Sequence, residues 1–198
     1  MDAARGLGAL GTLIGLVRAL PQFIRLLKTR DAHGVSLDTA ATSCVVSFAW
    51  ATYGVLTDQL VVVLATGLSG AVFALITLLA LKLGRRVSEL RAAPIWFAIA
   101  LVVTVVGGSV ALGVILSAGA LVANVPQVVV AYRERDLTGL SPSTWALTAS
   151  DGAVWSLYGI ITGDIPIMVN NLFQFSTSAA IVIRRLAWGR TRPQPSEA

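Results

Sequence analysis

The chain has 198 residues, of which 56% are hydrophobic and only 13% are charged. Because a soluble domain carries about 25% charged residues, this composition excludes an ordinary water-soluble protein and indicates an integral membrane protein. The net charge is +5, but the basic residues lie at the ends of apolar segments, which argues against a nucleic-acid-binding surface. The single cysteine, Cys44, excludes an intramolecular disulfide framework.

Seven apolar segments are candidates for membrane-spanning helices, since a span needs roughly 20 mostly apolar residues. In chain order they cover about 6–27, 37–56, 60–83, 92–107, 110–132, 142–161 and 165–186. The fourth is short because Gly107-Gly108-Ser109 ends it. A polar linker at 84–91 precedes it, and the polar tail has the composition of a disordered segment.

Two copies of one pattern lie in the first three and the last three segments. The first copy contains Leu20-Pro21-Gln22, a basic turn with Gly34 and Ser36, and Trp50-Ala51-Thr52-Tyr53-Gly54. The second contains Val125-Pro126-Gln127, a basic turn with Gly139 and Ser141, and Trp155-Ser156-Leu157-Tyr158-Gly159. All matched positions are 105 residues apart, with no gap between them. A constant offset through apolar helices and a polar turn indicates an internal repeat.

Basic residues follow the first, third, fifth and seventh segments, and none follow the second, fourth or sixth. They are Arg25, Lys28 and Arg30; Lys82, Arg85, Arg86 and Arg91; Arg133 and Arg135; and Arg184, Arg185, Arg190 and Arg192. This asymmetry predicts an amino terminus outside and a carboxyl terminus in the cytoplasm. The fourth segment keeps the two repeats parallel, so we expect a 3+1+3 arrangement.

The order of Pro-Gln, basic turn, Gly-x-Ser and Trp-x-x-Tyr-Gly, found twice, resembles the PQ-loop superfamily. More narrowly, it is similar to the SWEET and SemiSWEET (MtN3/saliva) sugar transporters. The resemblance implies an all-α membrane protein with seven transmembrane helices, in which two parallel triple-helix bundles face a central cavity. We expect repeats at 6–83 and 110–187, a cytoplasmic linker and linker helix at 84–109, and a disordered cytoplasmic tail at 188–198.

Two aromatic residues, one amide and one threonine are candidate solute contacts. The resemblance implies that Trp50 and Trp155 form cavity walls, because an indole stacks on the apolar face of a sugar ring. The alternative is an interfacial aromatic belt, which also suits the neighbouring tyrosines. Asn171 matches the position of the sugar-contacting asparagine in SemiSWEETs, and Thr66 is its counterpart in the first repeat.

Asn170 and Asn171 are also candidates on physical grounds. Amides are costly against lipid, so we expect both to face the protein interior. Gln174 lies one turn below on the same face and extends this polar wall.

Pro21 and Pro126 each remove a backbone donor and are predicted to kink a helix. Gln22 and Gln127 are candidate partners for the freed carbonyls. A static packing kink is the alternative, whereas the resemblance implies that these prolines flex the inner gate.

Two charges, Arg18 and Asp151, lie inside predicted spans. At 1.5 Å per residue, each is about 13 Å from the inner end of its span, so an ion pair across the cavity is one hypothesis. In the other, Asp151 is a substrate or proton site with Arg18 as counter-charge. Arg before Leu-Pro-Gln also resembles the proton-linked lysosomal and vacuolar PQ-loop carriers of cationic amino acids.

The chain shows no nucleophile–base set, phosphate loop or metal-ligand spacing, so we expect neither an enzyme nor a cofactor or metal. The leading hypothesis is a multi-pass protein of a bacterial-type inner (cell) membrane that moves a small polar solute by alternating access. A sugar is the leading candidate for this solute. The alternatives are a proton-coupled carrier of amino acids or organic cations that uses Asp151, and a non-transporting receptor. Expected partners are the solute and the lipid bilayer, without nucleic acid; a homo-oligomer stays open.

Overall fold

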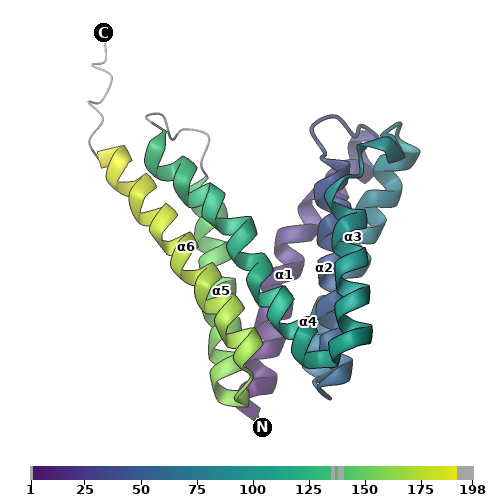
Figure 1. Ribbon diagram of the computed structural model, residues 1–198. Coiled ribbons are helices and arrows are strands. Elements are labelled where there is room, and N and C mark those ends of the chain that lie inside the picture. The colour runs from purple at the N-terminus through teal and green to yellow at the C-terminus, as the bar shows by residue number, and fades with distance from the viewer. Residues whose placement is uncertain (1, 135–136, 138–140, 191–198) are drawn as a thin grey trace. The chain divides into compact units, whose positions relative to one another are not determined.

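The computed structural model describes residues 2–134, 137 and 141–190. These form six α-helices and one short 3-10 helix (Figure 1). In chain order they are α1 (Asp2–Thr29), α2 (Leu37–Leu56), α3 (Leu60–Lys82), η1 (Val87–Glu89), α4 (Ala92–Arg133), α5 (Pro142–Thr162) and α6 (Ile165–Arg190). The helices group into two compact units, Met1–Leu116 and Ser117–Ala198. The motif residues Arg135, Asp136 and Gly139, and the tail from 191 to 198, lie outside the described residues.

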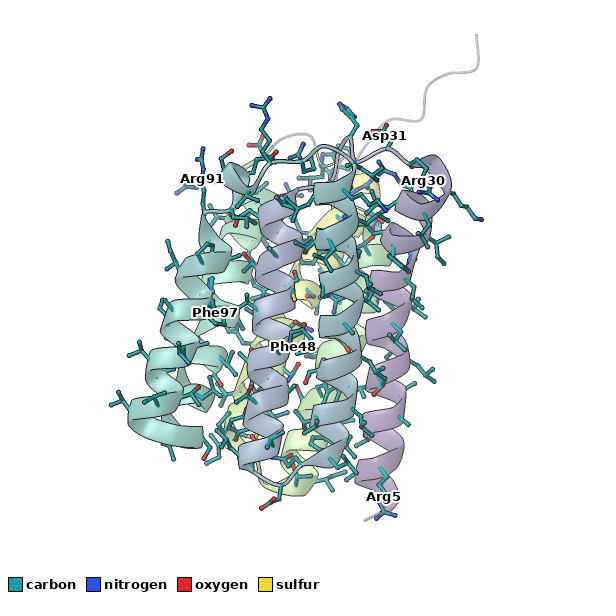
Figure 2. The ribbon with its side chains drawn as sticks, turned by 90° about the vertical axis from the view of Figure 1, so that its right-hand side faces the viewer. Arg5, Arg30, Asp31, Phe48, Arg91 and Phe97 are labelled. Atoms are coloured by element: carbon teal, nitrogen blue, oxygen red, sulfur yellow. The ribbon has the colours of Figure 1, made fainter. Side chains whose placement is uncertain are left out.

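In the first unit, α3 packs against both α1 and α2, so it lies between the helices that precede it in the chain (Figure 2). The tight turn between α2 and α3 makes those two helices neighbours, whereas the longer loop after α1 reaches the far side of α3. A buried cluster that includes Leu26, Val35, Leu37 and Ile76 fixes this loop against the helices.

One carboxylate joins the start of α2 to the start of α4. Asp38 accepts backbone N–H groups from Arg91 at 2.9 Å, Ala92 at 3.0 Å and Ala93 at 3.1 Å. These are the N–H groups that a helix leaves without partners at its amino end, and a carboxylate also suits the positive end of the helix dipole. Asp38 therefore determines where α4 begins.

In the second unit, α5 and α6 pack side by side (Figure 1). A Cβ atom at Gly152 would lie 2.7 Å from the backbone nitrogen of Phe175, and one at Gly159 would lie 2.5 Å from that of Met168. Only glycine permits so close an approach, which is how small residues bring helices together in lipid. The Ser117 hydroxyl donates to the Pro166 carbonyl at 2.9 Å and so connects α4 to α6.

Helix α4 is interrupted near its middle. Gly108 has φ 59° and ψ −148°, which is not a helical conformation, and it lies where the sequence predicts a break. A straight helix of these 42 residues would be about 63 Å long, roughly twice the hydrocarbon thickness of a bilayer.

Five helical segments of the described part are long and apolar enough to cross a membrane. They are Ala3–Thr29, Leu37–Leu56, Leu60–Lys82, Ala92–Ala120 and Ile165–Trp188. The number is below the predicted seven for two reasons. Helix α4 contains two of the predicted segments, and α5 carries polar residues, including Asp151, along its length. Large apolar side chains such as Val105 (77% exposed) and Val106 (82% exposed) are suited to contact with acyl chains.

Candidate functional site

A buried polar seam joins α5 and α6 in the second unit. Asp151, on α5, is only 8% exposed. The Gln174 amide of α6 donates to the Asp151 Oδ2 atom at 3.3 Å and to the Thr148 carbonyl at 3.5 Å. Thr148 is also 8% exposed. The carboxylate therefore lies inside the protein, where a charge is expensive unless polar groups surround it.

Asn171 lies one turn from Gln174 on α6 and is 9% exposed. Its Nδ2 atom donates to the Ile167 carbonyl at 2.8 Å. An amide has two N–H donors and an accepting oxygen, so this bond leaves capacity for a ligand. Asn170 is half-buried. The predicted interior position of Asn171 agrees with its burial, whereas Asn170, predicted to face the interior as well, and Gln174 are only half-buried.

Each predicted aromatic pair is in contact within its own helix. The ring centroids of Trp50 and Tyr53 are 5.5 Å apart with planes at 82°, and those of Trp155 and Tyr158 are 5.3 Å apart with planes at 67°. Both tryptophans are half-buried, whereas the tyrosines are 4% and 3% exposed. The tyrosines therefore do not form the lipid-facing belt that the sequence allowed. They pack inside and support the indoles edge to face.

The first unit offers hydroxyl groups where the second offers amides. Thr66 is half-buried on α3, and its hydroxyl donates to the Val62 carbonyl at 2.7 Å. Ser69 donates to the Ala65 carbonyl at 3.0 Å. Both hydroxyls are bonded to their own helix, so each retains only acceptor capacity for a ligand.

The model of the PQ loop repeat family matches residues 3–63 and 108–168. These two stretches cover more than half of the chain, and their starts are 105 residues apart, the same offset as the repeated motif. The chain belongs to the PQ-loop repeat family. No curated protein matches the sequence.

Among solved structures, the 3.7 Å resolution structure of a eukaryotic SWEET transporter matches with a TM-score of 0.69 and 16% sequence identity. The match covers 95% of this chain and 99% of the SWEET chain. At this identity the likeness shows the fold. Together with the apolar helices, it makes this PQ-loop protein a multi-pass membrane protein.

The two Pro-Gln pairs of the PQ-loop repeats lie within helices. Helix α1 continues through Pro21, which is exposed, and Gln22 is half-buried. Helix α4 continues through Pro126, whose side chain is outside the described part, and Gln127 is exposed. The gating role of these four residues stays a prediction.

The two charges that the sequence predicts within membrane spans belong to different units. Arg18 is exposed on α1 of the first unit, and Asp151 is buried on α5 of the second. Their ion pair across the cavity stays a prediction.

Two polar residues of the second unit were missed by the sequence analysis. Thr148 lies three residues before Asp151, and this helical spacing was a usable signal for a shared face. Ser117 gave no such signal, because its partner is the Pro166 carbonyl 49 residues away. Within the described ranges, no group of three His, Cys, Asp or Glu side chains is arranged to hold a metal ion.

Proposed function

We propose that this PQ-loop protein moves a small polar solute across a membrane by alternating access, with a sugar as the leading candidate. The observation that supports this function most strongly is the doubled PQ-loop repeat, which has a half-buried tryptophan in each copy. The buried amide of Asn171, three residues after the second matched stretch, supports it as well. A fold shared with a eukaryotic SWEET transporter supports the same function.

The proposed architecture is 3+1+3. Two features favour it. The break at Gly108 divides α4 into two helices, and of the two family matches one ends well before this break, at residue 63, and the other begins at it, at residue 108. Both repeats then run in the same direction through the bilayer and enclose a cavity between them, as parallel-repeat transporters do.

The proposed orientation places the basic ends of the helices in the cytoplasm. In the first unit, Arg30 and Arg91 lie at one end and Arg5 lies at the other (Figure 2). The basic linker around Arg85 and Arg86 follows α3 at the first of these ends. An excess of Lys and Arg in short loops marks the cytoplasmic side, so the amino terminus is outside and the carboxyl terminus inside.

In this proposal the side chains have distinct roles. Trp50 and Trp155 stack on the apolar face of the solute. Asn171 and Asn170 bond its hydroxyl groups, and Thr66 does so from the first repeat. Pro21 and Pro126 flex the gate, and Gln22 and Gln127 bond the carbonyls that the prolines leave without a donor.

Uptake into proteoliposomes tests the proposal. Vesicles that contain the purified protein are given radiolabelled hexoses, pentoses and disaccharides, beside empty vesicles and vesicles with Trp155→Ala. We expect uptake of at least one sugar and a loss of that uptake in the variant. No uptake of any sugar contradicts sugar transport, and binding without flux points to a receptor.

A second candidate function, a proton-coupled carrier of amino acids or organic cations, is favoured by the buried Asp151. Its carboxylate is positioned by Gln174 inside a membrane helix, where ionisable residues mark proton and ion pathways. Arg18 is then the counter-charge. Asp151→Asn retains the size of the side chain and an acceptor for Gln174. A pH gradient drives uptake in the native protein and not in this variant if the carrier is proton-coupled, whereas a sugar uniporter ignores the gradient in both.

A further inference from the structure

An apolar pocket of about 390 Å³ lies within the first unit, between α2, α3 and the first turns of α4. Its walls include Ala41, Cys44, Ala74, Thr77, Pro94 and Phe97. The pocket exists because alanines occupy the facing positions of all three helices. Their small side chains do not fill the space between the helix backbones.

The pocket does not suit a polar solute. Among the described residues that line it, only Cys44 and Thr77 have polar side-chain atoms, and the Thr77 hydroxyl already donates to the Phe73 carbonyl at 2.8 Å. A cavity with such walls is not favourable for water or a sugar, because neither finds hydrogen-bond partners there. A hydrocarbon chain is the kind of ligand that suits these apolar walls.

Basic residues flank one end of the pocket along the chain, and this end is called its rim. Leu90 lines the pocket, and Lys82, Arg86 and Arg91 are exposed on the segments next to it. Arg91 directly precedes α4, and Phe97 lies within that helix, further from this end of the unit (Figure 2). The pocket therefore extends from the charged end of the unit into its apolar part.

The acidic residues near the rim already have partners. Glu89 forms an ion pair with Arg85 at 2.5 Å. The Asp38 carboxylate accepts the first N–H groups of α4, so that helix end is already capped. An anion at this rim would therefore contact the exposed basic side chains and not the helix terminus.

We propose that this pocket binds one acyl chain of an anionic phospholipid whose phosphate group contacts Arg86 and Arg91. The ligand must join a hydrocarbon chain to a negative head group, because the pocket joins an apolar wall to a basic rim. Basic pockets at the ends of membrane helices select lipids in this way. The site is separate from the proposed solute site, since none of its lining residues belongs to the Trp-Tyr pairs or the polar seam.

Alkylation of Cys44 provides a direct test, since it lines the pocket and is the only cysteine in the chain. The protein in detergent is titrated with dioleoyl phosphatidylglycerol or dioleoyl phosphatidylcholine, and the rate of labelling by a small membrane-permeant maleimide is measured. We expect phosphatidylglycerol to protect Cys44 at lower concentrations than phosphatidylcholine. Arg86→Gln and Arg91→Gln should each weaken that protection about fivefold. Arg30→Gln, at the same end of the unit but directly after α1, is the matched charge control and should have little effect.

A second measurement does not depend on the thiol. Native mass spectrometry should show one retained phosphatidylglycerol, which is lost in Ala74→Phe because the ring fills the pocket. Ala179→Phe, 105 residues later on α6, is the matched control and should retain the lipid. Equal Cys44 protection by the two lipids, or retention of phosphatidylglycerol by a folded Ala74→Phe protein, would overturn the proposal. Transport activity enters neither measurement, so this proposal and the proposed function fail independently.

Discussion

The two PQ-loop repeats have the same local structure at their helix ends and differ in their helix interiors. Ser36 begins α2 by accepting the Thr39 N–H at 3.2 Å, and Ser141 begins α5 by accepting the Thr144 N–H at 3.4 Å. In each pair the threonine hydroxyl also donates to the serine oxygen. The same four-residue motif thus starts the second helix of both repeats.

The turns that follow these helices are also alike. Thr57 donates its hydroxyl to the Tyr53 carbonyl and Thr162 donates to the Tyr158 carbonyl, both at 2.8 Å. The residue after each threonine has a positive φ. Such groups determine where helices stop and in which direction the chain turns, so they specify the fold of each repeat.

The interiors of the helices differ in polarity. At the repeat offset, three polar residues of the second unit correspond to less polar residues of the first: Asp151 to Val46, Asn171 to Thr66 and Gln174 to Ser69. The buried Asp151–Gln174 contact therefore has no equivalent carboxylate–amide pair in the first repeat. The comparison teaches that the helix ends encode the shared fold, and the interiors of α5 and α6 encode the polar chemistry of one half.

The largest expected effect comes from Gly152, where α5 touches the backbone of α6. Gly152→Leu should destabilise the protein by about 3 kcal/mol, since backbone atoms cannot move aside for the new side chain. Size-exclusion profiles and thermal midpoints in detergent measure this loss. Gly67→Leu is the control, because a Cβ at Gly67 meets nothing within 4 Å. Equal stability of the two variants would show that the close helix contact is not required.

The next largest effect concerns the polar positions themselves. Asn171→Ala should lower solute uptake about thirtyfold, since an amide contributes two hydrogen bonds worth about 1 kcal/mol each. Thr66→Ala should lower it only about threefold, because the Thr66 hydroxyl is already bonded to Val62. Uptake into proteoliposomes checks both. Equal losses would mean that the two repeats contribute alike to the site.

A smaller effect is expected at the positive-φ turn residues. Gly163 has φ 72° and its counterpart Asp58 has φ 55°. Gly163→Val should lower the stability of the protein by about 1–2 kcal/mol, because a branched side chain is strained in this conformation. Asp58→Gly should cost less, since glycine adopts positive φ freely. Thermal unfolding in detergent measures both, and tolerance of valine would contradict the expected turn geometry.

The smallest effects belong to the helix caps. Ser36→Ala and Ser141→Ala should each lower the stability of the protein by about 1 kcal/mol. The two losses should be similar, because each serine accepts the N–H of the threonine three residues later. Asparagine at either position should restore most of the loss. A shift in thermal midpoint for one alanine variant and not the other would show that the two caps are not equivalent.

Much of the fold was predictable because its signals are local. Apolar length and the Ser36 cap give α2 the predicted bounds of 37–56, and the glycine pair gives the break at Gly108. The packing of α3 between α1 and α2 was not predicted from the residues themselves. The contact of Asp38 with α4 also escaped prediction, since it joins positions 53 to 55 residues apart.

Part of the candidate site could also be predicted from the sequence. Burial of Asn171 and of Asp151 follows from the cost of polar groups in lipid, and the structure confirms it. The contact of Gln174 with Asp151 and Thr148 depends on which faces of α5 and α6 meet. The faces that meet are determined by the close approach of the two helices at Gly152. No periodicity in the sequence indicates this approach.

The proposed function depends most on the two repeats running parallel through the membrane. In a Cys44→Ser background, His33→Cys, Asp58→Cys and Glu134→Cys are each labelled with a membrane-impermeant maleimide, in right-side-out and inverted vesicles. All three residues are exposed. If the repeats run parallel, positions 33 and 134 react from one side of the membrane and position 58 from the other. Labelling of positions 33 and 134 from opposite sides would contradict the parallel arrangement.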